Sequence, residues 1–390
     1  YKRQVLSGVN LNSTTKDFSI FLTDTLSVSE QFKLSASGSY NYTSLDQSGA
    51  QSQYLNGDGG YNWTDSVTGV SYYNPSYLSA YKFSNSGTGA ATTHNAVAGI
   101  AGPETNSLNG NHQYRRFNPS VGFNFKANSN TAIFGNYSES MRTPTSVELS
   151  CANPLSPCAL PTGFNGDPDL KAVVAKTIEL GARGKVGERT SWNAAVYDSR
   201  LSNDIQFIAT SNTYGYFANV GNTERRGFEL GAQTRWDAFS LSGNYGYVNA
   251  VYKSPFTTAG GESVVSGNKI PGIPSNSFKV RTTYSPHQDW LLGLNMMVVG
   301  DQFTHGNESN TDPNGKVAGY TLVNLDLHYN ITSDLKLALN VNNLFNKQYA
   351  TYGISGLTSV YSLATQNFLT PAAPRAAFVG LSYQFGSGMP

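Results

Sequence analysis

Long stretches of strictly alternating residues constrain this chain more than any other feature. In "FKLSASGSYNYT" (32–43) the even positions are apolar, aromatic or glycine, and the odd positions are polar. Because successive side chains of a strand point to opposite faces, a period of two predicts a strand with one apolar and one polar face. The same alternation recurs within 177–186, 228–236, 278–284, 323–329, 337–342 and 377–385.

The length of these strands narrows the fold class. Alternation over about 10 to 12 residues is long for a soluble β-sandwich but fits a tilted strand that crosses a bilayer. In 337–342 we therefore expect the leucines and valine to face lipid, and the alanine and asparagines to face an enclosed interior. Aromatic residues lie near the strand ends, where we expect their amphipathic rings to be at the level of the lipid head groups.

Composition excludes several other classes. Only 13% of residues are charged and the net charge is +1, so the chain has no broad basic surface for nucleic acid. No window approaches 18 consecutive apolar residues, which excludes a transmembrane helix. The mean hydropathy of −0.34 is compatible with membrane strands, because alternating polar and apolar residues average to a polar value. The 39 glycines, 24 tyrosines and 20 phenylalanines favour strands and turns.

Short and long connections alternate along the chain. Outer-membrane barrels have short periplasmic turns and long extracellular loops, so this order predicts an all-β, transmembrane antiparallel β-barrel fold with about 14 strands. A soluble sandwich or propeller predicts closer turn spacing or a repeat, and the sequence has neither. We expect long extracellular loops at about 45–113, 142–172, 254–274, 301–318 and 351–373, with shorter members of the same class near 12–16 and 209–215.

The two cysteines lie close together, in "CANPLSPCALP". Six residues separate Cys151 from Cys158, which is enough to close a small disulfide loop in an oxidising compartment. A catalytic or metal-binding pair would favour CxxC spacing or added histidines, and neither is nearby.

The C-terminal region resembles that of the TonB-dependent outer-membrane receptors. "GYTLVNLDLHYNITSDLKLALNVNNLFNKQYATYG" and "APRAAFVGLSYQF" resemble a family pattern of strand, tight turn, a strand ending in N-L-F-(D/N)-K-x-Y, a last loop, P-R and a final strand ending in Phe. Other stretches match in the family's order, such as "GDPDLKAVVAKTIELGARG" and "FANVGNTERRGFELGAQTRW", so the resemblance covers most of the chain outside the long loops. The motif residues are Asn343, Leu344, Phe345, Tyr349 and Phe385.

The resemblance implies a 22-stranded barrel plugged by an N-terminal domain. This chain has neither the plug nor the TonB-contacting box, so we interpret residues 1–390 as the partial, C-terminal portion of a receptor barrel. The residues "GSGMP" follow Phe385, whereas the family's terminal aromatic is the last residue.

The resemblance also implies a function and a place in the cell. It predicts a bacterial outer-membrane receptor for uptake of a scarce nutrient, such as a ferric siderophore, energised by the TonB–ExbB–ExbD complex through the plug. A passive porin-like channel is the alternative from another class, and cobalamin, haem, sugars and nickel chelates are alternative ligands.

We find no constellation that predicts an enzyme, a cofactor or a metal site. The five histidines are scattered, with no HExxH motif and no pair spaced to hold a metal, and no serine lies in a nucleophile elbow. The glycine-rich "GDGG" (57–60) lacks the strand and helix that phosphate binding needs.

Aromatic side chains in the first long loop are candidate ligand contacts. Rings set among Ser, Asn and Gly suit stacking against a planar or apolar ligand, although the same rings would equally form a loop core. Arg116 and Arg142, near outer strand ends, are candidates to meet an anionic chelate, or to pair with acidic groups of a plug. The aromatic candidates are Tyr54, Tyr61, Trp63, Tyr72, Tyr73, Tyr77, Tyr81 and Phe83.

Overall fold

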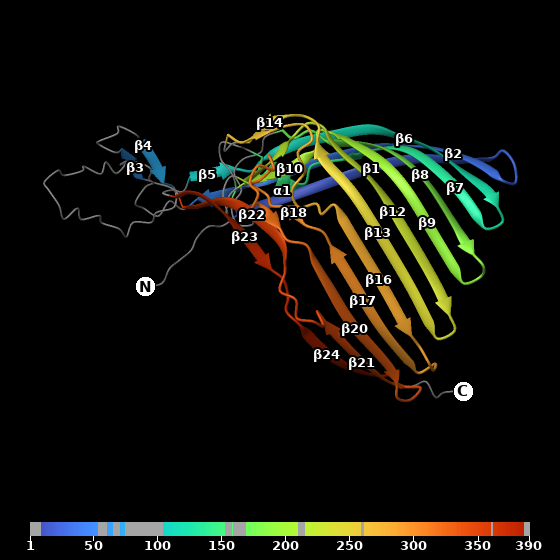
Figure 1. Cartoon of the computed structure of the whole chain (residues 1–390). Helices are drawn as coiled ribbons and strands as arrows, with labels where there is room; N and C mark the ends of the chain where they lie inside the picture. Colours follow the sequence, from blue (N-terminus) through green and yellow to red (C-terminus); the bar gives the residue numbers. More distant parts are fainter. Residues whose placement is uncertain are drawn as a thin grey trace.

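The computed structural model describes a curved antiparallel sheet with small hairpins gathered at one end (Figure 1). The described residues are 9–53, 61–64, 71–74, 104–152, 158, 169–209, 215–258, 261–359 and 362–385.

Thirteen strands follow one another across the large sheet, each antiparallel to its neighbours. A short strand, β5 (Glu104–Ser107), adds a further pairing to the end of the second strand. The order is β1 (Val9–Ser27), β2 (Phe32–Gln53), β6 (Gly110–Asn128), β7 (Thr131–Arg142), β8 (Val173–Val186), β9 (Thr190–Ser202), β12 (Thr223–Trp236), β13 (Phe239–Tyr252), β16 (Asn276–Tyr284), β17 (Trp290–Val299), β20 (Tyr320–Asn330), β21 (Leu335–Asn342) and β24 (Ala376–Tyr383).

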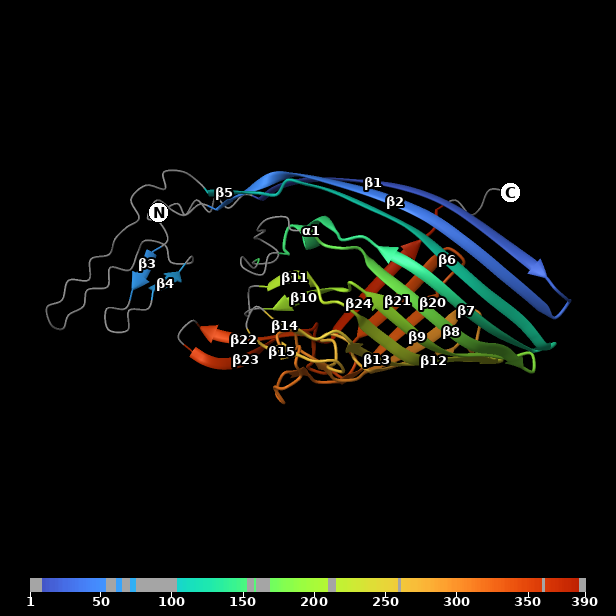
Figure 2. The same ribbon diagram turned by 90° about the horizontal axis from the view of Figure 1, so that it is seen from above.

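Five two-stranded hairpins and one short helix, α1 (Ser146–Leu149), lie in the long connections. Figure 2 shows α1 and the hairpins at the end of the sheet opposite the short turns. The hairpins are β3 (Tyr61–Thr64) with β4 (Ser71–Asn74), β10 (Ile205–Ala209) with β11 (Gly215–Asn219), β14 (Phe256–Thr257) with β15 (Ser263–Val264), β18 (Gln302–Phe303) with β19 (Lys316–Val317), and β22 (Ala350–Ser359) with β23 (Ser362–Pro371).

This architecture confirms the predicted all-β fold and the alternation of connections. Short turns at 28–31, 129–130, 187–189, 237–238, 285–289 and 331–334 join strands at one end of the sheet. Among the described residues, no helix is both long enough and apolar enough to cross a membrane.

The connection expected at 12–16 is wrong, because β1 runs through those residues without a break. Asn12 pairs with Ser48 and Lys16 with Ser44, so β1 continues along an extension of β2 that reaches Gln53. Polar residues form regular strand here because the partner strand supplies backbone hydrogen bonds whatever the side chains are. The large sheet therefore begins with one long strand where the sequence suggested two.

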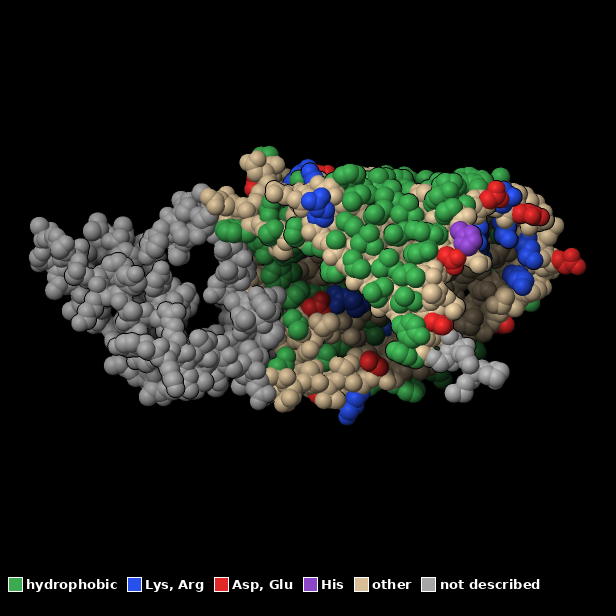
Figure 3. All heavy atoms as spheres, turned by 90° about the horizontal axis from the view of Figure 1, so that it is seen from below, with side chains coloured by type: hydrophobic (Ala, Val, Ile, Leu, Met, Phe, Trp, Pro, Cys, Tyr) green, Lys and Arg blue, Asp and Glu red, His purple; other side chains and the backbone are tan. Residues whose placement is uncertain are grey.

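The outer face of the sheet carries exposed apolar side chains. Leu327, Leu339 and Val379 are register partners on three adjacent strands and lie on this face, as the alternation predicts. In water such a surface would be costly, whereas hydrocarbon accommodates it. Figure 3 shows hydrophobic side chains gathered in a broad band, with charged side chains concentrated at its border on the side of the short turns. Exposed members of the outer face include Phe18, Ile20, Leu22, Ile178, Leu180, Val196, Leu230, Leu292, Leu294, Val379 and Leu381.

Aromatic rings border this band at the short-turn end. Phe239 stacks on Tyr284 with ring centroids 4.3 Å apart, and Trp290 stacks on Tyr329 at 4.2 Å. Trp236 is directly opposite Phe239 in the register and continues the row. Amphipathic rings are favoured at the membrane interface, so the row marks one boundary of the membrane.

Polar and charged groups occupy the inner face. Arg281 on β16 binds Asp326 on β20 with hydrogen bonds of 3.0 and 3.1 Å, and Asn295 on β17 donates to the same carboxylate at 2.9 Å. The sheet is thus apolar outside and polar inside, which is the arrangement of a strand wall around an aqueous or protein-filled interior.

Candidate functional site

The end of the sheet opposite the short turns is built around a small hydrophobic core. The hairpin β10–β11, the end of β13 and the segment around β15 bury their apolar side chains against one another. Burial of this kind holds the loops in one arrangement, because a loop that moves away would expose its apolar side chains to water. The buried members are Ile208, Tyr216, Val220, Ala250, Tyr252, Val264 and Ile270.

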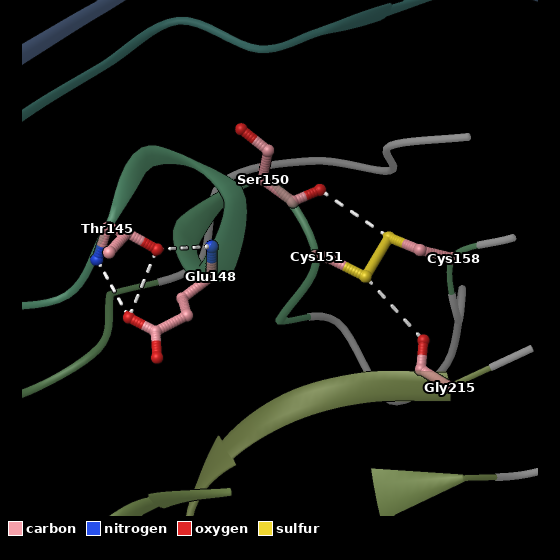
Figure 4. The surroundings of a disulfide bond; sticks show 6 residues. All are labelled: Thr145, Glu148, Ser150, Cys151, Cys158 and Gly215. Carbon is pink, nitrogen blue, oxygen red and sulfur yellow. Dashed lines mark hydrogen bonds between the residues drawn. A yellow bond between two sulfur atoms is a disulfide. The ribbon is translucent and has the colours of Figure 1, made fainter. Parts of the chain in front are cut away.

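A disulfide closes the segment after α1 into a small loop, and backbone hydrogen bonds hold this loop against the hairpin β10–β11 (Figure 4). Cys151 and Cys158 are bonded, which confirms the prediction from their spacing. Cys158 exchanges two backbone hydrogen bonds with Gly215, of 2.7 and 3.0 Å, and the amide of Phe217 donates to the Cys151 carbonyl at 2.7 Å. Both cysteines are fully buried, so the closed loop is packed against its surroundings.

The helix α1 begins with a complete capping box. The Thr145 side chain accepts from the amide of Glu148, and the Glu148 carboxylate accepts from the amide of Thr145. The same carboxylate binds Arg142 at the end of β7 through Nη1, with distances of 3.0 and 2.8 Å. Arg142, a candidate ligand contact, therefore ties the strand end to the helix.

Arg116, the second arginine candidate, lies where two strands part. The pairing of β6 with β7 ends at Ser120 and Ser138, and the rest of β6 pairs with β2. Arg116 Nη2 donates to Glu139 Oε2, and Glu139 Oε1 also lies 3.4 Å from Lys176 Nζ. The Arg116 Nε atom is buried and has no hydrogen-bond partner within the described part of the chain.

A cavity of about 530 Å³ occupies this parting between β6 and the start of β8. The Tyr114 hydroxyl donates to the carbonyl of Leu170 at 3.0 Å across it, and His112 Nδ1 lies 3.4 Å from Asp169 Oδ1. Its lining thus combines two arginines, a lysine, a histidine and a tyrosine with apolar groups such as Met141 and Val174. That mixture is typical of sites for small polar molecules.

The structure places the aromatic candidates only in part. Tyr54, Tyr77, Tyr81 and Phe83 lie outside the described residues. The other four are in the hairpin β3–β4, where the backbone register pairs Trp63 with Tyr72 and Asn62 with Tyr73. Four aromatic residues are therefore brought together within two four-residue strands.

A buried carboxyl lies among the outer hairpins and was not singled out from the sequence. Glu308 is 1% exposed, and its Oε1 accepts from the amide of Gly306 at 2.9 Å. Its Oε2 has no hydrogen-bond partner among the residues that the structure describes. Burial raises the pKa of Glu308 to about 7, and the nearby Glu262 carboxylate adds to this rise.

Next to it, His305 packs between two aromatic rings. Its ring centroid is 5.4 Å from that of Tyr352 and 6.2 Å from that of Phe207. Burial lowers the pKa of His305, and it raises the pKa of Tyr352, which also feels the charge of Glu308. No pattern in the sequence points to this cluster, because its members are scattered over three hairpins.

The C-terminal motif forms a tight corner at the end of β21. Asn343 and Asn346 have φ angles of +51° and +53°, in the left-handed region that asparagine tolerates better than most residues. The Asn343 side chain closes the corner, since its Nδ2 donates to the carbonyl of Lys347 at 2.9 Å and its Oδ1 accepts from the amide of Lys347 at 2.8 Å.

The other motif residues flank this corner. The amide of Leu344 donates to the carbonyl of Val323 at 2.7 Å, which ties the corner to β20, while the Phe345 side chain is exposed on the outside. Tyr349 packs on Tyr320 with centroids 4.5 Å apart, and Phe385 packs edge-on against Tyr383 at 4.7 Å. The motif is therefore a structural device that ends one strand and redirects the chain.

No three His, Cys, Asp or Glu side chains converge as metal ligands within the described ranges. What the geometry does define is a class of protein: a membrane β-barrel wall with an apolar outside, a polar inside and packed hairpins at one end.

Comparison with known proteins identifies the family. The family model described as "TonB dependent receptor-like, beta-barrel" matches residues 4–344. The chain therefore belongs to the TonB-dependent receptor family, whose barrels lie in the bacterial outer membrane.

Individual relatives are similar at low identity. The probable TonB-dependent siderophore receptor PiuA of Acinetobacter baumannii is 25% identical over 256 residues, covering 62% of this chain and 32% of the relative. The catecholate siderophore receptor Fiu of Escherichia coli K12 is 23% identical over 346 residues, covering 88% and 39%. The crystal structure of Fiu in its closed form superposes with a TM-score of 0.64 at 19% identity, covering 96% of this chain and 45% of that one. This chain thus spans less than half the length of these relatives.

Proposed function

We propose that this chain is the C-terminal part of the barrel wall of a receptor that imports a ferric siderophore across the outer membrane. Family membership is the observation that carries the proposal. Two relatives with siderophore receptor in their names support the ligand class. The receptor binds and moves its ligand, and no bond of the ligand is made or broken.

The proposal assigns ligand contact to the end of the sheet where the hairpins gather. A metal chelate of this class is bulky, and many carry aromatic rings and negative charge. Trp63 and Tyr72, which are partners in the backbone register of β3–β4, are the proposed residues for stacking against the ligand. Arg116 lines the cavity beside β6, and its buried Nε still has a hydrogen to donate to an anionic oxygen.

Energy for release into the periplasm comes, in this proposal, from the TonB–ExbB–ExbD complex acting on a plug domain. The inner face supports this role of a plug, because polar groups such as the Arg281–Asp326 pair suit contact with a folded polar domain better than contact with lipid. The ligand would thus bind at the extracellular end of the barrel, and the energy source would act from its periplasmic end.

Uptake of labelled iron tests the proposal. Cells with and without the gene are given iron-55 bound to a catecholate, a hydroxamate or a phenolate siderophore, in parallel with labelled cobalamin and haem. We expect the deletion to abolish uptake of at least one ferric siderophore and to leave cobalamin and haem uptake unchanged. Loss of cobalamin or haem uptake alone would reject the siderophore assignment.

A second arm tests the energy source. The same uptake is measured after deletion of the gene for TonB and after collapse of the membrane potential. We expect both treatments to stop uptake while surface binding persists. Uptake that continues after both treatments would instead identify a passive porin-like channel.

The predicted contacts are tested by W63A with Y72A and by R116Q. Each is expected to weaken binding of the imported siderophore by about tenfold, the typical effect of losing one well-placed aromatic or charged contact. W290A, at the short-turn end, serves as the control and should leave siderophore affinity unchanged.

A further inference from the structure

A cluster of charged residues interrupts the apolar outer face near the hairpin end. Lys176 on β8, Arg200 on β9, Arg226 on β12 and Lys253 just after β13 form what we call the outward cation cluster. The strands β8, β9, β12 and β13 are consecutive neighbours in the sheet (Figure 1). The cluster is therefore one continuous patch.

The alternation of side chains places the cluster on the lipid-facing side. Lys176 shares its face with Ile178 and Leu180, Arg200 shares its face with Val196, and Arg226 with Leu230. These apolar neighbours are among the exposed hydrophobic residues of the outer face. The cations consequently point away from the interior through which a ligand would pass.

The height of the cluster matches the upper edge of the membrane. Arg226 lies ten residues before Trp236, which belongs to the aromatic row at the short turns. Ten residues at about 3.4 Å each, in a strand tilted by about 45°, span about 24 Å along the membrane normal. This equals the height of the apolar band of such barrels, so the cluster lies at the level of the outer-leaflet head groups.

The carboxylates of the cluster lie beneath the cations. The Glu224 side chain is 6% exposed and contacts three cations, with Arg226 Nη2 at 3.1 Å, Arg200 Nε at 3.6 Å and Lys253 Nζ at 3.6 Å. The Lys176 and Arg200 side chains are 55% and 66% exposed. The surface presented outward is therefore positive.

Charge balance and register leave this positive surface only partly neutralised. Five cations, the four of the cluster and Arg116, share the three carboxylates Glu139, Asp198 and Glu224. Lys176 and Arg200 are directly opposite each other in the β8–β9 register. Like charges so placed repel unless an anion lies between them.

The patch is also local. The outward positions of the neighbouring strands β16, β17 and β20, as the structure describes them, carry no charged side chain. On the other side of the cluster the same face carries Arg115 on β6 and Lys16 on β1. The outward cations are therefore confined to one part of the sheet, whereas a general attraction to head groups would favour cations around the whole sheet.

We propose that the outward cation cluster binds the phosphate groups of an outer-leaflet lipid, with Lys176 and Arg200 holding one phosphate between them. The guanidinium group of Arg200 donates two hydrogen bonds and the Lys176 ammonium supplies a point charge. The acyl chains of the lipid lie along Ile178, Leu180 and Val196 below the cluster. Phosphorylated lipid A, the glycolipid of the outer leaflet, has this combination of phosphate and acyl chains.

The test uses the whole receptor, extracted from outer membranes in a mild detergent and stripped of lipid. Native mass spectrometry follows its titration with bisphosphorylated lipid A. We expect K176Q/R200Q to bind lipid A at least about tenfold more weakly, because each Lys or Arg near a head group contributes to the attraction. K185Q/R235Q is the matched control, since it removes one Lys and one Arg that are exposed near the short turns, and it should bind as the wild type does.

Several results would overturn the proposal. Equal lipid A affinity of K176Q/R200Q and wild type would do so, as would an equal loss in K185Q/R235Q. Displacement of lipid A by inorganic phosphate at the same phosphate concentration would show a site for soluble anions. Should K176Q/R200Q fail to fold, the wild type still decides the matter: binding must weaken as sodium chloride is raised, and lipid A affinity that is independent of salt would contradict a phosphate contact.

Discussion

Arg281 and Asp326 form an ion pair across an intervening strand. Their strands, β16 and β20, are separated by β17, and the residue of β17 directly opposite Asp326 is Gly293. A Cβ atom on Gly293 would lie 2.3 Å from Asp326 Oδ2. The pair exists because this position has no side chain, which leaves space for the carboxylate above the strand.

Gly293→Ala should therefore disrupt the pair and lower stability. The new methyl group displaces the carboxylate from Arg281, at a cost of about 1 to 2 kcal/mol, kept low because the arginine is partly exposed to water. Thermal unfolding of the detergent-solubilised protein measures the change. Gly243→Ala is the control, since its Cβ would meet nothing within 4 Å. Equal losses in both variants would contradict the explanation.

Removal of the disulfide should loosen the hairpin end of the sheet. In Cys151→Ser/Cys158→Ser the closed loop of eight residues opens, and the chain-entropy relation gives a loss of about 2.5 kcal/mol. We expect faster hydrogen exchange in β11, where Gly215 and Phe217 bond to the cysteine backbones. A reducing agent should produce the same change in wild type and none in the variant. Unchanged exchange in β11 would show that packing alone holds the segment.

Two substitutions of Asn343, in the corner after β21, should lower stability by different amounts. Asn343→Ala loses three side-chain hydrogen bonds and places alanine, which tolerates positive φ less well than asparagine, at this position, so we expect a destabilisation of about 2 to 3 kcal/mol. Asn343→Gly loses the hydrogen bonds but accepts the backbone conformation, and should cost about 1 kcal/mol less. Chemical unfolding of the two variants separates the contributions, and a larger loss for the glycine variant would refute this account.

Glu308 should make the hairpin end sensitive to pH. Its pKa is raised to about 7 in the folded state, so the folded protein retains a proton that the unfolded chain releases at lower pH. Stability therefore falls as pH rises from the ordinary glutamate pKa to about 7, by roughly 3 kcal/mol in all, and remains low above that pH.

Hydrogen exchange around Gly306, corrected for intrinsic rates, measures this effect between about pH 5 and about pH 8. We expect more opening at the higher pH in wild type and little pH dependence in Glu308→Gln. Glu188→Gln, in an exposed short turn, should behave as the wild type does. An identical pH dependence in wild type and Glu308→Gln would assign the effect to another group.

Much of the fold is predictable because alternation and strand length carry the physical constraint directly. A residue such as Leu339 must face lipid once its neighbours are polar, and the short turns follow from where alternation stops. The error at 12–16 has the opposite origin: Asn12 to Lys16 lack an apolar face, and only the long partner β2 reveals them as strand.

The candidate site was less predictable, because its contacts join residues that are distant in sequence. The spacing of Cys151 and Cys158 sufficed for the disulfide, but nothing near Arg142 in the sequence distinguishes a ligand contact from its bond to Glu148. Glu308 likewise resembles any loop glutamate in the sequence, although it is 1% exposed in the folded chain. Local patterns report local structure, whereas burial depends on the assembled loops.

The distance between the outward cation cluster and the aromatic row has a consequence for the surrounding bilayer. A hydrophobic thickness of about 24 Å is smaller than the roughly 30 Å of a typical bilayer core, and it suits the thinner outer membrane. In a thicker membrane the adjacent acyl chains would have to shorten or tilt around β12, at a cost that grows with each ångström of mismatch. Lipid thickness is therefore a variable that any reconstitution of this protein has to control.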